Sequence, residues 1–187
     1  MSARLVRHPT AIAGVEVIAR TPLADARGVF ERLYCAADLA ALGGGRPIVQ
    51  INRSLTRARG TVRGLHYQRP PHAETKFVTC LRGAVWDLAL DLRAGSPTFL
   101  QWHAERLEAE RPTTLVIPEG CAHGFQTLTD DCELLYLHTA SHVPEAEGGV
   151  RADDPRLAIP WPLPLGERSA RDRALALLDD DFRGIAP

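Results

Sequence analysis

The chain has 187 residues, of which 45% are hydrophobic and 24% are charged. These fractions are typical of soluble globular domains and argue against a disordered or fibrous protein, and the length fits a single domain over residues 1–187. A formal net charge of −1 excludes a general electrostatic attraction to nucleic acid or to an anionic membrane. Because no run is long enough to span a membrane and the first residues lack the apolar core of a signal peptide, we expect a cytoplasmic protein.

Short apolar runs separated by proline- and glycine-rich turns recur along the chain. In chain order, we expect strands at residues 14–19, 47–52, 61–68, 76–81, 84–92, 113–118 and 132–140. Helical periodicity is confined to residues 35–44, which end in glycines, and to residues 169–181. Many short strands with regular turn signals predict an all-β sandwich or barrel with short flanking helices.

Two of the expected strands indicate how their faces are used, because side chains alternate across a pleated strand. In the fifth strand, the alternate residues from Trp86 to Leu92 form one apolar face, which we expect to be core. The opposite face is small and acidic and includes Asp87, to which we assign no role. In the last strand, Tyr136 and His138 share a face, and this pattern favours an amphipathic wall over a barrel interior.

The histidines could bind a metal only if several of them converge. The segment "PEGCAHGFQ" has the P-x-G-x-x-H form of the second cupin motif and would deliver His123 into a small barrel. The first cupin motif would supply His-x-His and a glutamate, but His66 is separated from His72 and Glu74 by a proline pair that should end the strand. Since a metal needs three or four converging ligands, we expect no metal and no other cofactor.

A histidine without a metal can act as a general base near neutral pH if its second ring nitrogen is held in place. Proton abstraction beside a carbonyl also needs a cation or hydrogen-bond donor at the developing enolate oxygen, and a second proton donor if the carbon is to be inverted. The sequence offers His66 as base, Asp172 as its orienting carboxylate, Tyr136 as acid, and Lys76 or His123 at the enolate.

Several ordered motifs point to one family. They are "RGLHYQ", "K-x-V-x-C-x-x-G", "D-x-A-x-D-L-R-x-x-S-P-T-F", "IPEGCAHGFQTL", "LLY" and "DDPRLAIPWP" followed by "SARD". Together, from about Arg27 to Asp172, they closely resemble the dTDP-4-dehydrorhamnose 3,5-epimerase family. The resemblance implies a metal-independent cupin jelly roll, usually a homodimer, that inverts C3, C5 or both in a nucleotide-diphosphate 4-keto-6-deoxysugar. The ketone at C4 of such a sugar acidifies the hydrogens on both carbons, so no nicotinamide is needed.

The resemblance also assigns roles to particular residues. It makes His66 the base, Tyr136 the opposing acid, Asp172 the partner of His66, and Lys76 a catalytic neighbour of the substrate. Asp172 also fits a helix capping box with Ser169, and it can serve both roles only if its carboxylate turns to the histidine.

The resemblance implies contacts to three parts of the substrate: the diphosphate, the nucleobase and the sugar. Arg27 and Arg63 would contact the diphosphate, and Arg63 can share a site with His66 only if Gly64 marks a bulge. The full set implied to bind substrate is Arg27, Gln50, Asn52, Arg63, His123, Glu147 and Arg171.

Two other functions remain open at this point. The first is a metal-dependent cupin oxygenase or isomerase using His66, His72, Glu74 and His123. The second is a non-catalytic cupin that binds a sugar. We leave Glu74, His138 and His142 as surface or wall residues, although His142 lies where the family often carries one of two tyrosines. Neither the nucleotide nor the inverted carbon follows from the sequence.

Overall fold

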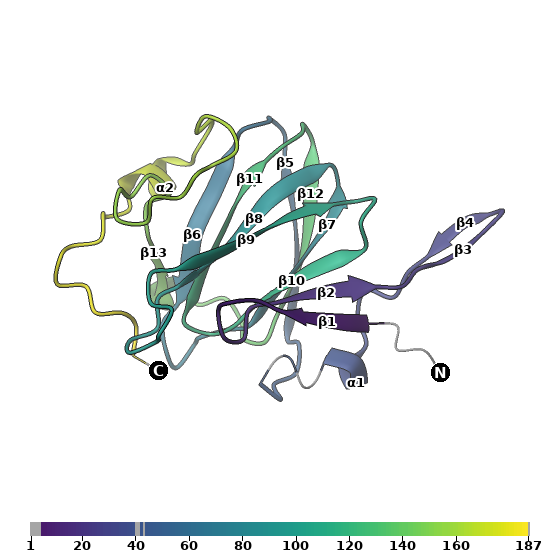
Figure 1. The fold of residues 1–187 in the computed structure, drawn as a ribbon, viewed down its shortest axis with the longest axis horizontal. Helices are drawn as coiled ribbons and strands as arrows, with labels where there is room; N and C mark the ends of the chain where they lie inside the picture. Colours follow the sequence, from purple (N-terminus) through teal and green to yellow (C-terminus); the bar gives the residue numbers. More distant parts are fainter. Residues whose placement is uncertain (1–4, 40–41, 43, 187) are drawn as a thin grey trace.

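The computed structural model describes residues 5–39, 42 and 44–186. Two antiparallel sheets lie face to face, and the C-terminal segment wraps around one side (Figure 1). The six-stranded sheet has the order β1 (Leu5–Pro9), β2 (Glu16–Arg20), β10 (Thr113–Ile117), β7 (Lys76–Arg82), β12 (Cys132–His138) and β5 (Gln50–Thr56). The five-stranded sheet has the order β13 (Glu147–Gly149), β6 (Val62–Gln68), β11 (Cys121–Thr127), β8 (Ala84–Asp91) and β9 (Trp102–Glu108).

The remaining elements are short. The hairpin β3 (Leu23–Asp25) and β4 (Gly28–Phe30) projects away from both sheets (Figure 1). The helices are α1 (Ala36–Leu39), α2 (Ala170–Ala174) and the 3-10 helix η1 (Pro144–Ala146). No helix in the described part of the chain is both long enough and apolar enough to cross a membrane.

The predicted β-sandwich is confirmed, and each of the seven predicted strands overlaps an observed one. The segment "PEGCAHG" turns at Pro118–Gly120 and then enters β11, which carries His123. The strand β9 was not predicted, since its sequence "WHAERLE" has too few apolar residues to stand out. It is paired with β8 along its whole length.

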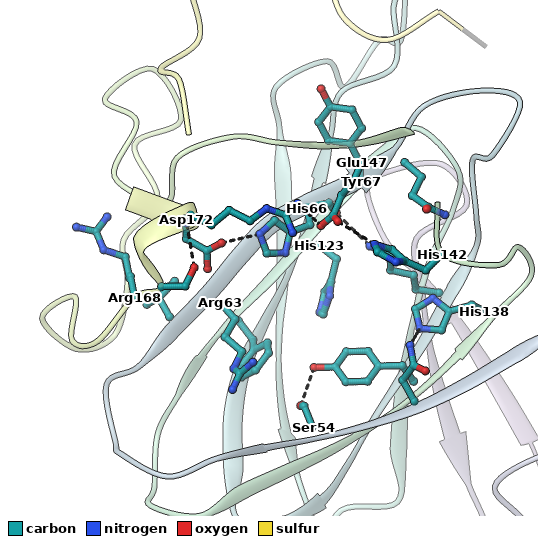
Figure 2. A pocket seen from close by; sticks show the side chains of 18 of the residues that line it. Ser54, Arg63, His66, Tyr67, His123, His138, His142, Glu147, Arg168 and Asp172 are labelled. Atoms are coloured by element: carbon teal, nitrogen blue, oxygen red, sulfur yellow. Dashed lines mark hydrogen bonds and ion pairs between the residues drawn. The ribbon is translucent and has the colours of Figure 1, made fainter. Parts of the chain in front are cut away.

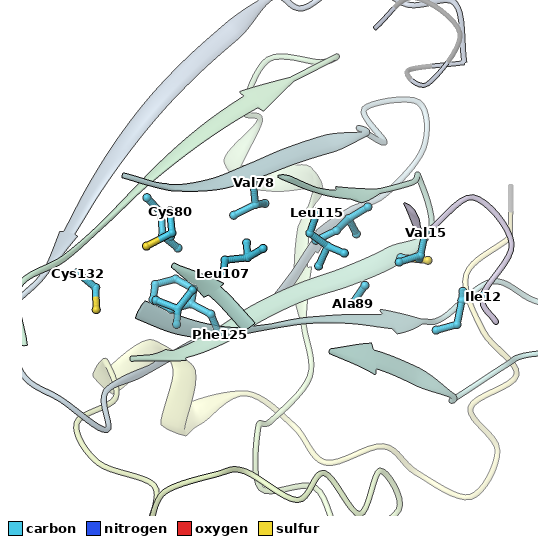
Figure 3. Close-up of a cluster of buried hydrophobic side chains, with 13 residues drawn as sticks. Ile12, Val15, Val78, Cys80, Ala89, Leu107, Leu115, Phe125 and Cys132 are labelled. Atoms are coloured by element: carbon cyan, nitrogen blue, oxygen red, sulfur yellow. The ribbon is translucent and has the colours of Figure 1, made fainter. Parts of the chain in front are cut away.

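The main core fills the space between the two sheets (Figure 3). Val78 and Leu115 from the six-stranded sheet lie in one cluster with Leu107 and Phe125 from the five-stranded sheet, and all four are at most 2% exposed. Removing such side chains from water supplies most of the driving force for closing a sandwich.

The strand β8 is buried on both faces, which corrects the expectation of a single core face. Val85 and Ala89 face the space between the sheets, whereas Leu88 and Leu90 lie in a second cluster on the outside of the five-stranded sheet. That outer cluster is covered by the C-terminal segment, including Leu157. Asp87 therefore points into the protein interior.

The C-terminal helix is shorter than its pattern predicts. Ser169 caps it by accepting a hydrogen bond from the Asp172 N–H at 2.9 Å, but the chain becomes extended at Leu175. Leu178 then packs into the outer cluster, and its N–H donates to the Asp154 carboxylate at 2.6 Å. The apolar spacing thus serves tertiary packing, which overrides helix propensity. The helix predicted at residues 35–44 is observed over Ala36–Leu39, and residues 40, 41 and 43 lie outside the described residues.

The expected bulge at Gly64 is confirmed. The pairing of β6 with β11 shifts register between His123 and Phe125, opposite Gly64. Gly64 has a φ of +117°, and a Cβ there would lie 2.6 Å from the Gly124 Cα. Only glycine tolerates both this conformation and this approach. The shift places Arg63 and His66 on the same side of the sheet, where both line one cavity.

We predict that Gly64→Ala lowers the free energy of unfolding by about 3 kcal/mol, because strain and a backbone clash add. Gly28→Ala is the matched control: Gly28 also has a positive φ of +131°, but a Cβ there meets no atom within 4 Å. The control should cost about 1 kcal/mol. Urea unfolding of both variants measures the difference, and equal losses would contradict the close-packing argument.

Candidate active site

A cavity of about 640 Å³ opens between the two sheets at one end of the sandwich. Strands β6 and β11 line it from one sheet, β5, β7 and β12 line it from the other, and residues 167–172 close one side. The close-up in Figure 2 shows His66, Asp172 and His123 together in this cavity. Two sheets thus present different side chains to the same enclosed space.

His66 and Asp172 form the dyad predicted from the sequence. The Nε2 of His66 lies 2.8 Å from Oδ1 of Asp172 (Figure 2). Burial by itself would raise the pKa of the Asp172 carboxyl, but the hydrogen bond and charge of His66 hold that pKa below its ordinary value. Because an ionised carboxylate only accepts, Nε2 must carry the hydrogen, and Nδ1 keeps the lone pair of a base.

Asp172 serves two structural purposes at once, as the capping pattern allowed. Its N–H donates to Ser169 at the start of α2, and its carboxylate is left for His66 and for the Gly64 N–H at 3.4 Å. The side chain is only 6% exposed. The short helix α2 therefore presents an ionised carboxylate to the base.

Tyr136 reaches the cavity from the opposite sheet. It lies on β12, whereas His66 lies on β6, and its hydroxyl is 3.1 Å from the Ser54 hydroxyl. Burial raises the pKa of the Tyr136 phenol, so the hydroxyl stays protonated. The strand face that carries Tyr136 and His138 thus lines the interior cavity, which corrects the amphipathic-wall interpretation.

His123 is held in the cavity by a buried carboxylate. Its Nε2 lies 2.8 Å from Oδ1 of Asp87, which is completely buried, and its ring meets the Tyr136 ring edge-on at 5.9 Å. Asp87 is a positioning residue that the sequence did not reveal, although it lies on a predicted strand. The second ring nitrogen of His123, Nδ1, remains to bind a polar substrate atom.

The metal-binding alternative would gather His66, His72, Glu74 and His123. His72 is exposed and does not line the cavity, and Glu74 is committed to His138. Within the described residues, no group of three or more His, Cys, Asp or Glu side chains is arranged to hold a metal ion.

Comparison with known proteins agrees with this geometry. A family model described as dTDP-4-dehydrorhamnose 3,5-epimerase matches residues 9–180. A dTDP-4-dehydrorhamnose 3,5-epimerase from Streptomyces griseus is 38% identical over 183 residues, which cover 96% of this chain and 90% of that protein. A dTDP-4-dehydrorhamnose 3-epimerase from Streptomyces niveus is 41% identical over 183 residues, which cover 96% and 87%. A solved dTDP-6-deoxy-D-glucose-3,5-epimerase from Legionella pneumophila, in complex with dTDP-4-keto-L-rhamnose, aligns with a TM-score of 0.87 at 36% identity and covers 97% of this chain and 98% of that one.

The chain belongs to the dTDP-4-dehydrorhamnose 3,5-epimerase family. The predicted resemblance, the cupin-type jelly roll and the isomerase class are thereby confirmed. All of the predicted site residues except Arg27 and Gln50 line the cavity of this epimerase.

The two exceptions lie elsewhere for different reasons. The Arg27 side chain is 90% exposed on the projecting hairpin and pairs with Asp25 at 2.6 Å. Gln50 does not line the cavity, and its amide oxygen accepts a hydrogen bond from the His142 N–H at 3.0 Å. Gln50 thus supports the segment that follows β12.

The epimerase carries several cations at the cavity. Arg63 donates to the Thr56 hydroxyl and to the Leu55 carbonyl oxygen and forms no ion pair with a carboxylate of the described residues, so its charge is free for an anionic ligand. Arg171 is paired with Glu147 at 2.7 Å, and Glu147 also lies 2.9 Å from His142. Burial would raise the pKa of Glu147, but these two partners lower it.

Lys76 completes the set of predicted catalytic residues. Its ammonium donates to the His66 carbonyl oxygen at 3.1 Å and lies 3.4 Å from Glu74. Glu74 and His138, which we left without a role, are also in the wall of the cavity. The sequence could not reveal them, because strand pairing brings them together across 64 residues.

The lowered pKa of Asp172 predicts a pH-dependent contribution to stability. A carboxylate whose pKa is lower in the folded state stabilises the fold above its unfolded pKa, near 3.9, and this contribution is lost as the pH falls through the folded value. Asp172→Asn should therefore be less stable than wild type at pH 6, and the difference should shrink below about pH 4. Chemical unfolding at both pH values tests this, and a constant difference would contradict it.

Proposed function

We propose that this epimerase inverts C3, C5 or both in a dTDP-4-keto-6-deoxysugar of the dTDP-4-dehydro-6-deoxyglucose type. The observation that carries the proposal is a base and an acid on facing sheets: His66 is held by Asp172 on one side, and a protonated Tyr136 lies on the other. An arrangement of this kind removes a proton from one face of a carbon and returns one to the opposite face.

The chemical step needs no group beyond those in the cavity. Nδ1 of His66 takes the proton from the carbon beside the ketone, and the electron pair of the broken C–H bond forms the enolate with its charge on the C4 oxygen. Lys76 supplies a cation for that charge. Tyr136 then donates its phenolic proton to the opposite face of the carbon, where the enolate electron pair forms the new C–H bond as the C4 ketone re-forms. Loss of the proton from His66 to water and uptake of one by the Tyr136 phenolate restore the enzyme.

The nucleotide part of the substrate would lie toward the open end of the cavity. Arg63 lines the cavity without an ion pair to the described carboxylates, and a guanidinium binds phosphate oxygens in a bidentate manner. Asn52 lines the same side and offers an amide. The Legionella relative, which is bound to a dTDP-sugar, supports dTDP as the carrier.

We predict that wild-type protein in heavy water incorporates deuterium into dTDP-4-dehydro-6-deoxyglucose at the inverted carbons. His66→Asn should abolish exchange at every carbon because it removes the base. Tyr136→Phe should keep exchange but slow inversion by about a hundredfold to ten-thousandfold, because it removes only the opposing acid. An NMR time course reports both events. Near-normal turnover by His66→Asn would refute the mechanism.

We also infer that the epimerase acts as a homodimer. The hairpin exposes Leu23, Val29 and Phe30 to 54%, 70% and 66%, and the edge strand β5 exposes Ile51 to 59%. Apolar patches and open strand edges of this kind are typical of interfaces. A second copy covering the hairpin would also allow Arg27 to reach that copy's cavity, as its assignment to the diphosphate requires.

For the dimer, we predict that Phe30→Glu yields monomers at micromolar concentration and lowers turnover, because it buries a charge in the proposed contact. Leu177→Glu is the matched control, since Leu177 is 47% exposed but lies outside the hairpin and β5. Sedimentation velocity distinguishes the states. A monomeric wild type, or a Phe30→Glu variant that stays dimeric, would contradict this interface.

A further inference from the structure

Lys76 is the only lysine in the chain, and the other basic residues counted with it are arginines. It is 8% exposed, so water screens its interactions with neighbouring charges only weakly. The nearest carboxylate is Glu74, whose side chain is also 8% exposed. The wall of the cavity therefore contains a buried acid that the catalytic steps do not use.

The two oxygens of the Glu74 carboxylate contact different partners at different distances. Oε2 lies 2.6 Å from Nδ1 of His138, whereas Oε1 lies 3.4 Å from Nζ of Lys76. Burial would raise the pKa of Glu74, but His138 and Lys76 together lower it. The shorter contact means that the imidazole, rather than the ammonium, takes the main hydrogen bond of this carboxylate.

Strand pairing and side-chain contacts hold the His138 ring in place. Strand pairing sets it opposite Lys76 on β7 and Gln50 on β5. Its Nε2 lies 3.4 Å from Nδ2 of Asn52, and its ring stacks beside Tyr136 with a centroid distance of 6.1 Å. Since the Asn52 amide nitrogen only donates, Nε2 accepts and Nδ1 carries the hydrogen that is given to Glu74.

This arrangement has a consequence for Lys76. An ammonium that forms a tight ion pair with a carboxylate has little charge left for the substrate. The imidazole of His138 takes the shorter contact of Glu74, so the carboxylate lies 3.4 Å from Nζ and does not close a tight ion pair with Lys76.

Resting on the proposed function, we propose that Glu74 and His138 are positioning residues for catalysis: His138 holds the Glu74 carboxylate away from a tight ion pair, so that the charge of the Lys76 ammonium is free to stabilise the enolate. Neither residue touches the reacting carbons. Their effect is on the transition state, where the negative charge develops, and much less on binding of the neutral ketone.

The kinetic test uses a set of matched variants. His138→Ala should lower kcat roughly tenfold with KM changed less than about twofold, because Glu74 then turns fully to Lys76. His138→Asn keeps a donor near the Nδ1 position and should retain most of the activity. Adding Glu74→Gln to His138→Ala removes the freed carboxylate and should restore kcat to within about threefold of wild type. His103→Ala, which removes a histidine beside Glu105 on β9 outside the cavity, is the control.

A second readout does not depend on turnover. Selective ¹³C labelling of lysine gives one side-chain signal, and its titration measures the pKa of Lys76 in the whole protein. That pKa should rise in His138→Ala, fall in Glu74→Gln, and stay unchanged in His103→Ala. His138→Ala lets the Glu74 carboxylate move closer to Lys76, whereas Glu74→Gln removes that negative charge.

The outcomes separate the two proposals. If wild type does not epimerise the dTDP-sugar, the proposed function fails, whatever the lysine titration shows. If wild type is active but His138→Ala has normal kcat and an unmoved lysine pKa, the positioning role is refuted. A double variant as slow as His138→Ala would also refute it, since removal of the carboxylate must then be irrelevant.

Discussion

The hydrogen bond between His66 and Asp172 joins the two parts of the molecule on which the chemistry depends. His66 belongs to β6 inside the five-stranded sheet, whereas Asp172 lies 106 residues later on the short helix α2. The helix reaches β6 because the C-terminal segment packs on the outer face of that sheet, with Leu157 and Leu178 in the outer cluster. The apolar packing outside the sandwich therefore determines which nitrogen of the base is free inside it.

The remaining groups are arranged around that free nitrogen by strand geometry. The bulge opposite Gly64 places Arg63 and His66 on one side of β6, so the base and a cation for the diphosphate share a cavity. The facing sheet contributes Tyr136 and Lys76, and its pairing of β7 with β12 brings the Glu74–His138 pair behind the lysine. Acid and base thus lie on facing sheets, which is what inversion at a carbon requires.

Much of this could be predicted from the sequence. The alternating strands follow from local rules, and the ordered motifs lead to the family. The bulge at Gly64 and the double use of Asp172 are conditions that the assigned site roles require. Contacts set by strand register could not be predicted from the sequence. No local pattern relates the members of the two pairs, which are Asp87 with His123 and Glu74 with His138. The C-terminal leucines fit a helical period, yet Leu178 packs in an extended segment because the outer face of the sheet needs cover.

The central claim is that Asp172 fixes the neutral imidazole of His66 with its hydrogen on Nε2, so that Nδ1 acts as the base. Nitrogen-15 NMR of histidine-labelled protein near pH 8, with His66→Asn used to assign the signal, measures this tautomer directly. The account predicts a protonated Nε2 and a bare Nδ1 for His66, with that preference lost in Asp172→Ala. A hydrogen found on Nδ1 in the wild-type protein, or a tautomer unaffected by loss of the carboxylate, would contradict it.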